Sequence, residues 1–219
     1  MLMVNHLIGF GAGGNAAVLS FQQAVSSGVD SSTYTFSSVA FGAAHPSRVV
    51  YWAGGGIGNG ALRTVSSVTI GGVTATVMHS STVGTSRVDI YAALVPTGTT
   101  GDIVVTYSGT MFNCGGAVWS AVDAIAGTTA FHTAATTTDA ASININVDTL
   151  GYAIGVSFAN GGTSCTWTGL TEESDTLIEA GNNVSTAAYR NLGGAVTVAV
   201  TADQAGTIAE YVCALASFR

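Results

Sequence analysis

Two glycine-rich segments come closest, by residue type and spacing, to a site that does chemistry. Residues 9–14 read Gly-Phe-Gly-Ala-Gly-Gly, the G-x-G-x-x-G pattern that places a dinucleotide pyrophosphate at the N-terminus of a helix. The pattern has this meaning only within a βαβ unit, whereas alternating β segments follow it here. A chain with 29 glycines also produces such a match by chance. We therefore expect no nucleotide cofactor.

The second glycine-rich segment, residues 54–60, has the composition of a phosphate-binding loop. A Walker A loop needs a lysine on the phosphates, and the chain has no lysine at all. The same absence removes Schiff-base and Ser–Lys mechanisms. We expect residues 54–60 to form a long mobile loop between two strands.

Nucleophiles and metal ligands are few and isolated. Residues 155–159 fall one residue short of a G-x-S-x-G motif, and the alternation around Ser157 places it within a strand instead of on a strand-to-helix turn. The histidines lack metal-ligand spacing; they are His6, His45, His79 and His132. We therefore assign no catalytic, cofactor or metal residue and predict that the protein is not an enzyme.

One acidic and aromatic segment is the best candidate for ligand contact. Glu172, Glu173 and Asp175, followed by Glu179, lack the order of a calcium loop, so we expect a solvated loop and leave cation binding by residues 172–182 open. Trp167 lies close to this predicted loop. It could stack on a carbohydrate together with other aromatics, or these aromatics could form the core of the fold. The candidate ligand or host contacts are Trp167, Glu172, Glu173 and Asp175.

The composition of the chain argues against some classes of binding partner. Charged residues make up 8% of the chain and the net charge is −7, with five scattered arginines as the only Lys or Arg. Nucleic-acid binding requires clustered cations, so we expect none. No apolar run reaches the length of about 18 residues that a membrane span needs. The cysteines are odd in number and lie in apolar runs, so we expect free buried thiols; they are Cys114, Cys165 and Cys213.

The elements that must position these residues are β-strands. Apolar and polar residues alternate from about residue 33 onward, as in Ile143–Val147 and Tyr152–Phe158. Val68–Ile70 and Val73–Ala75 flank Gly71-Gly72, which predicts a two-residue hairpin with Ile70 opposite Val73. A short helix is expected over Asn15–Ser26, and a short helix or turn near residues 180–190. No repeat of about 20–50 residues is evident.

These features predict an all-β fold with a single β-sandwich or jelly-roll-like domain. Residues 1–32 are expected to form an N-terminal arm with a short helix, and residues 33–219 the sandwich. Residues 1–8 are apolar but have no basic region before them, which is unlike a signal peptide. We therefore expect assembly in a host cytoplasm into a particle.

The chain resembles the largely uncharacterised β-sandwich structural proteins of tailed bacteriophages and prophages. The segments that carry the resemblance are turn and strand signatures: Tyr34–Ser37 with Gly42, Arg48–Val50, Val68–Thr76, Val95–Thr106 and Trp167–Leu170. It implies a virion component, such as a capsid decoration or cement protein or a tail-associated protein, with other virion proteins as partners. It implies no functional residues.

Three functions are therefore carried forward. The first is a non-enzymatic structural component of a virion, expected as a homo-oligomer, with a trimer among the closed forms. The alternative is a receptor- or carbohydrate-binding module of a tail fibre that recognises a host-surface glycan through residues 54–60 and 160–185. A jelly-roll glycan hydrolase is a minor alternative.

Overall fold

A computed structural model of the protein describes residues 16–179 and 181–219, and these residues form strands without any helix. The predicted all-β class is therefore confirmed. No helix that could cross a membrane occurs within the described residues. The strands are β1 (Val18–Ser27), β2 (Ser31–Ala40), β3 (Val49–Ile57), β4 (Val65–Ile70), β5 (Val73–Thr74), β6 (Thr76–Val83), β7 (Ser86–Leu94), β8 (Thr100–Met111), β9 (Cys114–Val122), β10 (His132–Thr136), β11 (Ile143–Val147), β12 (Tyr152–Thr168), β13 (Thr171–Glu179), β14 (Asn182–Arg190) and β15 (Val196–Phe218).

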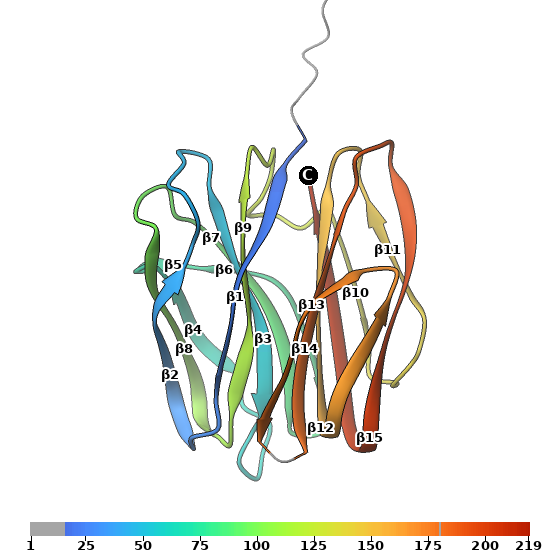
Figure 1. The fold of residues 1–219 in the computed structure, drawn as a ribbon. Coiled ribbons are helices and arrows are strands. Elements are labelled where there is room, and N and C mark those ends of the chain that lie inside the picture. Colours follow the sequence, from blue (N-terminus) through green and yellow to red (C-terminus); the bar gives the residue numbers. More distant parts are fainter. Residues whose placement is uncertain (1–15, 180) are drawn as a thin grey trace, which may run out of the picture.

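Residues 18–122 form a first sandwich of two antiparallel sheets, which occupies the left half of Figure 1. One sheet has the strand order β1-β9-β3-β7-β6 and the other has the order β2-β8-β4-β5. Alternate side chains of each strand point into the space between the sheets. Trp52 of β3, Phe36 of β2 and Ile103 of β8 are buried together there.

Residues 132–218 form a second sandwich, in the right half of Figure 1. Its first sheet has the order β10-β15-β12-β14-β13. Strands β12 and β15 are long enough to take part in two sheets. Register shifts between Asn160 and Ser164 separate the two stretches over which β12 and β15 pair. Strand β11 pairs with the first part of β15. Ile145, Trp167 and Leu215 lie in the core on this side.

The two sandwiches repeat one topology. In each, the first strand of the half lies at an edge beside the last strand, and the third strand follows: β1-β9-β3 in one half and β10-β15-β12 in the other. The second strands behave alike too, because β2 pairs with the strand before β9 and β11 pairs with the first part of β15. Where the sequence indicates one sandwich over residues 33–219, the structure has two sandwiches with the same strand order.

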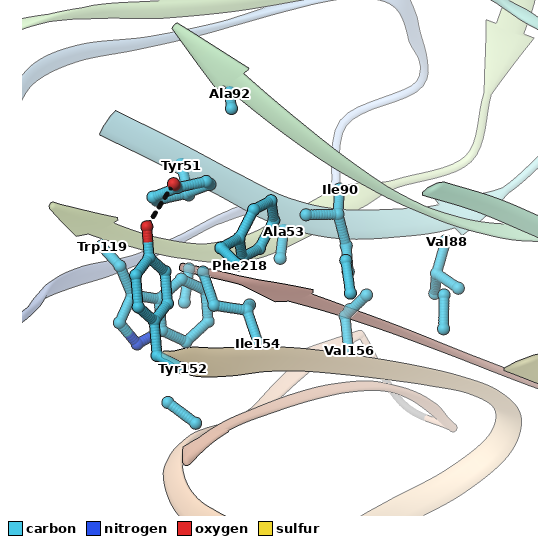
Figure 2. Packing of buried hydrophobic residues seen from close by; sticks show 14 of the residues in the cluster. Tyr51, Ala53, Val88, Ile90, Ala92, Trp119, Tyr152, Ile154, Val156 and Phe218 are labelled. Carbon is cyan, nitrogen blue, oxygen red and sulfur yellow. Dashed lines mark hydrogen bonds between the residues drawn. The ribbon is translucent and has the colours of Figure 1, made fainter. Parts of the chain in front are cut away.

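The halves pack through the equivalent sheets, which bury a shared aromatic core between them. Tyr51 of β3 and Tyr152 of β12 approach from opposite sides, and their hydroxyl oxygens lie 2.6 Å apart (Figure 2). The Phe218 ring lies 4.7 Å from the Tyr51 ring and 5.4 Å from that of Tyr152, measured between centroids. Trp119 of β9 is buried in the same cluster. This continuous core joins the two sandwiches into one body.

The expected helix over Asn15–Ser26 is wrong, because Val18–Ser27 form strand β1, which pairs with β9; Asn15 lies outside the described residues. Apolar and polar residues alternate only over Leu19–Phe21, because Ala16–Leu19 are all apolar and a register shift follows between Phe21 and Gln23. The sequence therefore does not show the period-two pattern that is typical of a strand. Of the short helix or turn expected near residues 180–190, the structure has a turn at Gly181, where φ is positive, while Asn182–Arg190 form strand β14 and not a helix.

The loop expected over residues 54–60 is also wrong for its first half. Gly54, Gly55 and Gly56 belong to β3, which is buried along its whole length. A Cβ at Gly54 would overlap the Gly115 carbonyl oxygen, and one at Gly55 would overlap that of Arg87. These glycines therefore allow close approach of backbones within a central strand. The predicted Gly71-Gly72 hairpin is confirmed, with Ile70 opposite Val73 and positive φ at both glycines.

Candidate functional site

Trp167 lies within β12 and its side chain is 8% exposed. Its Nε1 donates a hydrogen bond of 2.8 Å to the Ser185 hydroxyl. A Cβ at Gly155 would come within 3.0 Å of the Trp167 ring, so the ring packs against the backbone of the first sheet of this half. Trp167 therefore offers no free face for stacking on a sugar. Trp52, Trp119 and Tyr51 are also buried, which supports the core interpretation of the aromatics.

The acidic segment is strand β13 and not the expected loop. The Asp175 carboxylate accepts a hydrogen bond of 3.0 Å from the backbone N–H of Cys165 and one of 2.8 Å from the Asn183 amide. The backbone N–H of Trp167, two residues after Cys165 and on the same side of β12, is close enough to Glu172 to oppose part of the rise in its pKa. Asp175 thus takes the place of a strand partner at Cys165.

The electrostatics of Glu172 reflect this structural position. Partial burial, followed by the neighbouring Asp175 carboxylate, raises the pKa of Glu172 above its ordinary value. Register shifts around Glu172–Ser174 and Leu177–Glu179 break the alternation of β13. A polar, irregular sequence of this kind looks like a loop, which explains the incorrect expectation.

Glu173 lies at the register shift between Glu172 and Ser174 and has no pairing partner in β14. It lines a surface hollow of about 420 Å³. The hollow lies where β13 begins and β14 ends. Its other lining residues are Thr171, Ala188, Tyr189, Arg190 and Leu192. Of these lining residues, the sequence predicts only Glu173 as a ligand contact. Tyr189 and Arg190 come from a strand that the sequence does not distinguish from a helix or turn.

Arg190 differs from the other arginines in its contacts. Within the described residues, no hydrogen bond or ion pair engages its guanidinium, and none engages the Glu173 carboxylate. The other four guanidinium groups all donate to protein acceptors: Arg48 to four carbonyls, Arg63 to the carbonyls of Asn59 and Thr110, Arg87 to Asp89 and Arg219 to Asp148. The hollow therefore contains one cationic and one anionic side chain, Arg190 and Glu173, and neither is paired within the described residues.

A second hollow, of about 530 Å³, lies on the first sandwich between the Gly71-Gly72 turn and the residues that follow β7. Asp102 is its only ionisable lining residue, and its carboxylate accepts a hydrogen bond of 3.0 Å from the Ser38 backbone N–H. The Phe41 ring lies beneath Gly71 and Gly101. This hollow is shaped mainly by backbone and threonine side chains and presents no free charge pair.

A third feature is an apolar surface at the end of the molecule that carries the C-terminus, the upper end in Figure 1. Ile125 is 75% exposed and Phe131 is 47% exposed there. Three hollows of about 250, 280 and 240 Å³ adjoin each other, since the first two share Arg219 and the last two share Phe131. We call this the apical surface, defined by Ala17, Ile125, Ala126, Ala130, Phe131, Leu150, Val196 and Arg219.

The serine and cysteine side chains that could act as nucleophiles are buried in the packed core. Ser157 is buried within β12, and its Oγ accepts a hydrogen bond of 3.0 Å from Gln204. The predicted free buried cysteines are confirmed, and burial raises the pKa of the Cys114, Cys165 and Cys213 thiols to about 12. Within the described part of the chain, no three His, Cys, Asp or Glu side chains converge as metal ligands would.

Comparison with protein-family models and with curated proteins gives no match. Function must therefore be inferred from the apical surface and the hollow beside Glu173. The first combines exposed apolar side chains with neighbouring depressions. The second combines unused charges with an aromatic side chain.

Proposed function

We propose that this protein is a non-enzymatic structural building block of a particle, as its resemblance to phage virion proteins implies, and that copies of it associate through the apical surface. The observation that carries this proposal is the concentration of exposed apolar side chains at one end of a β-body. Contiguous apolar patches on soluble proteins commonly mark protein contacts. The bonding partner proposed for this surface is a second copy of the chain.

Three charged side chains line the first apical hollow, Asp123, Asp148 and Arg219. Because Asp148 and Arg219 already form an ion pair of 3.1 Å, burial of the surface would take only the Asp123 carboxylate from water without an ionic partner. Burying a side chain such as Ile125 or Phe131 contributes about 1.5–3 kcal/mol. Several such side chains from each copy, together with neighbouring alanines, supply a driving force of the size that association needs.

A second copy fits because the surface is complementary to itself. Ile125 and Phe131 are exposed on it, and Ile125 borders a hollow whose lining also includes Ala17 and Leu150. In a two-fold contact, or around a closed ring such as a trimer, a projecting side chain of one copy enters a hollow of the next. Virion components repeat around closed axes in the same way.

Analytical ultracentrifugation of the full chain tests the proposal. The unaltered protein should sediment as an oligomer at micromolar concentration, and Ile125→Asp with Phe131→Asp should convert it to a monomer because the contact would bury unpaired carboxylates. Val29→Asp is the matched control, since Val29 is 67% exposed and lies beyond the opposite end of β1. This control should remain oligomeric.

Location on a particle is tested separately by immunogold labelling of intact phage particles produced with the native gene. Labelling of the head or tail supports the building-block role. A protein that stays monomeric in solution and is never found on particles would refute it.

A further inference from the structure

We propose that the hollow formed by Thr171, Glu173, Tyr189, Arg190 and Leu192 binds a neutral saccharide ring. Its lining residues differ from those of the apical hollows, so it can be tested by variants that leave the apical surface unchanged. It also differs from the carbohydrate site expected around Trp167, whose ring is buried. The proposal is carried by three properties of the hollow: its shape, its free polar groups and its rigid aromatic wall.

The shape follows from the pairing of two strands. Strand β13 begins at Thr171, which pairs with Ala188, so Tyr189 and Arg190 extend past the end of β13. The register shift after Glu172 leaves Glu173 without a pairing partner and beside this exposed edge. The resulting volume of about 420 Å³ lies within the range of roughly 300–1,000 Å³ that is typical of small-molecule sites. It suits one or two sugar rings.

The polar groups of the hollow lack partners of their own. Within the described residues, the Arg190 guanidinium, the Glu173 carboxylate and the Tyr189 hydroxyl receive or donate no hydrogen bond. Although Arg190 and Glu173 have opposite charges and line the same hollow, they form no ion pair. A carboxylate accepts hydrogen bonds and a guanidinium only donates them. A ligand rich in hydroxyl groups satisfies both, because each hydroxyl can donate and accept.

The charges also select against other ligand classes. Glu173 disfavours an anionic ligand and Arg190 disfavours a cationic one, so together they favour a neutral polyhydroxylated molecule. Hydrogen bonds that involve an ionised partner are stronger than those between neutral groups. A neutral sugar can therefore form such hydrogen bonds with both side chains and repels neither.

The apolar walls fit the C–H face of a sugar ring. Tyr189 is half-buried and packs against the buried cluster that contains Trp167, so its position is fixed by the core. Leu192 is 80% exposed at the rim. The preceding residue, Asn191, anchors this turn through hydrogen bonds of 2.8 Å to the Asp148 carbonyl and 2.7 Å to the Gly194 carbonyl. The Tyr189 wall therefore loses little conformational freedom when a ligand binds.

A glycan array that contains neutral and acidic glycans, probed with the full chain, provides the first measurement. We expect binding to a group of neutral glycans. Two-dimensional NMR titration with methyl glucoside, galactoside and mannoside should then shift the amide signals of residues 171–173 and 188–192. Glu173→Gln and Arg190→Gln should each weaken binding by at least about tenfold, which corresponds to about 1.4 kcal/mol.

Asp203→Asn is the matched control for Glu173→Gln. Asp203 is exposed on β15, and no described residue donates a hydrogen bond to its carboxylate, so the charge change is the same outside the hollow. This variant should bind like the unaltered protein, and all variants should keep the same melting temperature. Absence of glycan binding, binding that Glu173→Gln and Arg190→Gln leave unchanged, or selective binding of extended peptides at the free edge of β14 would each overturn the proposal.

Discussion

At the scale of single residues, Arg48 shows how a charged side chain can serve the fold alone. It is fully buried without a carboxylate partner, and burial lowers its pKa from the ordinary value. Its guanidinium donates four hydrogen bonds of 2.8 Å to the carbonyls of Gly42, Val95, Thr97 and Gly98. One side chain thereby fixes the two loops that border the hollow beneath the Gly71-Gly72 turn.

Arg48→Met should lower the free energy of unfolding by about 3 kcal/mol, because one buried carbonyl and three part-buried carbonyls lose their donor. Urea denaturation followed by circular dichroism measures this change. Arg190→Met is the matched control, since Arg190 makes no hydrogen bond within the described chain, and its effect should stay within about 0.5 kcal/mol. Equal effects of the two substitutions would contradict this role of Arg48.

Single residues were also where the sequence was most and least informative. The cysteines were predictable as buried thiols because each lies within an apolar run. Trp167 was not, because a tryptophan in a polar strand end has the same local sequence as one in a loop. Its burial depends on Gly155, which is 12 residues away in the chain and leaves room for the ring.

At the scale of elements, β13 provides an acceptor for an N–H group of a strand to which it is not paired. Asp175 accepts from the backbone N–H of Cys165, while Glu173 lines the hollow at the register shift. Neighbouring carboxylates of β13 therefore have different roles. Asp175 accepts hydrogen bonds within the fold, whereas Glu173 lines the hollow because the register shift leaves it unpaired.

Asp175→Ala should lower the free energy of unfolding by about 1–3 kcal/mol, because the Cys165 N–H and the Asn183 amide lose their acceptor. Asp175→Asn should lose less, since an amide oxygen still accepts one of these hydrogen bonds. Glu173→Ala, whose carboxylate receives no hydrogen bond within the described residues, should change stability by less than about 0.5 kcal/mol. Thermal and urea denaturation provide the comparison, and a stable Asp175→Ala variant would rule out this role.

Elements were predictable from sequence where local chemistry decides them. The hairpin at Gly71-Gly72 follows from a turn that needs positive φ at both positions. The strand over Gly54–Gly56 could not be predicted, because glycine is also the commonest loop signal. Only the proximity of the Gly115 and Arg87 carbonyls explains why glycine occurs there.

At the scale of the whole molecule, two sandwiches with one strand order share a buried interface. Gly115 lies where the halves approach closely, since a Cβ there would come within 2.7 Å of Ile178 Cδ1 and 3.1 Å of Val184 Cγ1. The repeat was not evident in the sequence because it spans about a hundred residues and preserves pairing order instead of a short motif. The all-β class, in contrast, was readable from alternation alone.

Gly115→Ala should destabilise the protein by about 1–3 kcal/mol, since an added methyl group must displace side chains of the opposite sheet. Gly194→Ala is the matched control, because nothing lies within 4 Å of an added Cβ there and its φ is not positive. Differential scanning calorimetry should show a lower melting temperature for Gly115→Ala alone. A melting temperature unchanged by Gly115→Ala would show that the interface tolerates separation.

The repeated strand order has a consequence for how the protein responds to dilution. Two sandwiches on separate chains would part as their concentration fell, but a covalent tether keeps the effective concentration of each near the other at a fixed, high value. The contact around Tyr51 and Tyr152 is therefore independent of the amount of protein present. Contacts between chains remain subject to mass action, so an assembly built from this protein comes apart into intact double sandwiches.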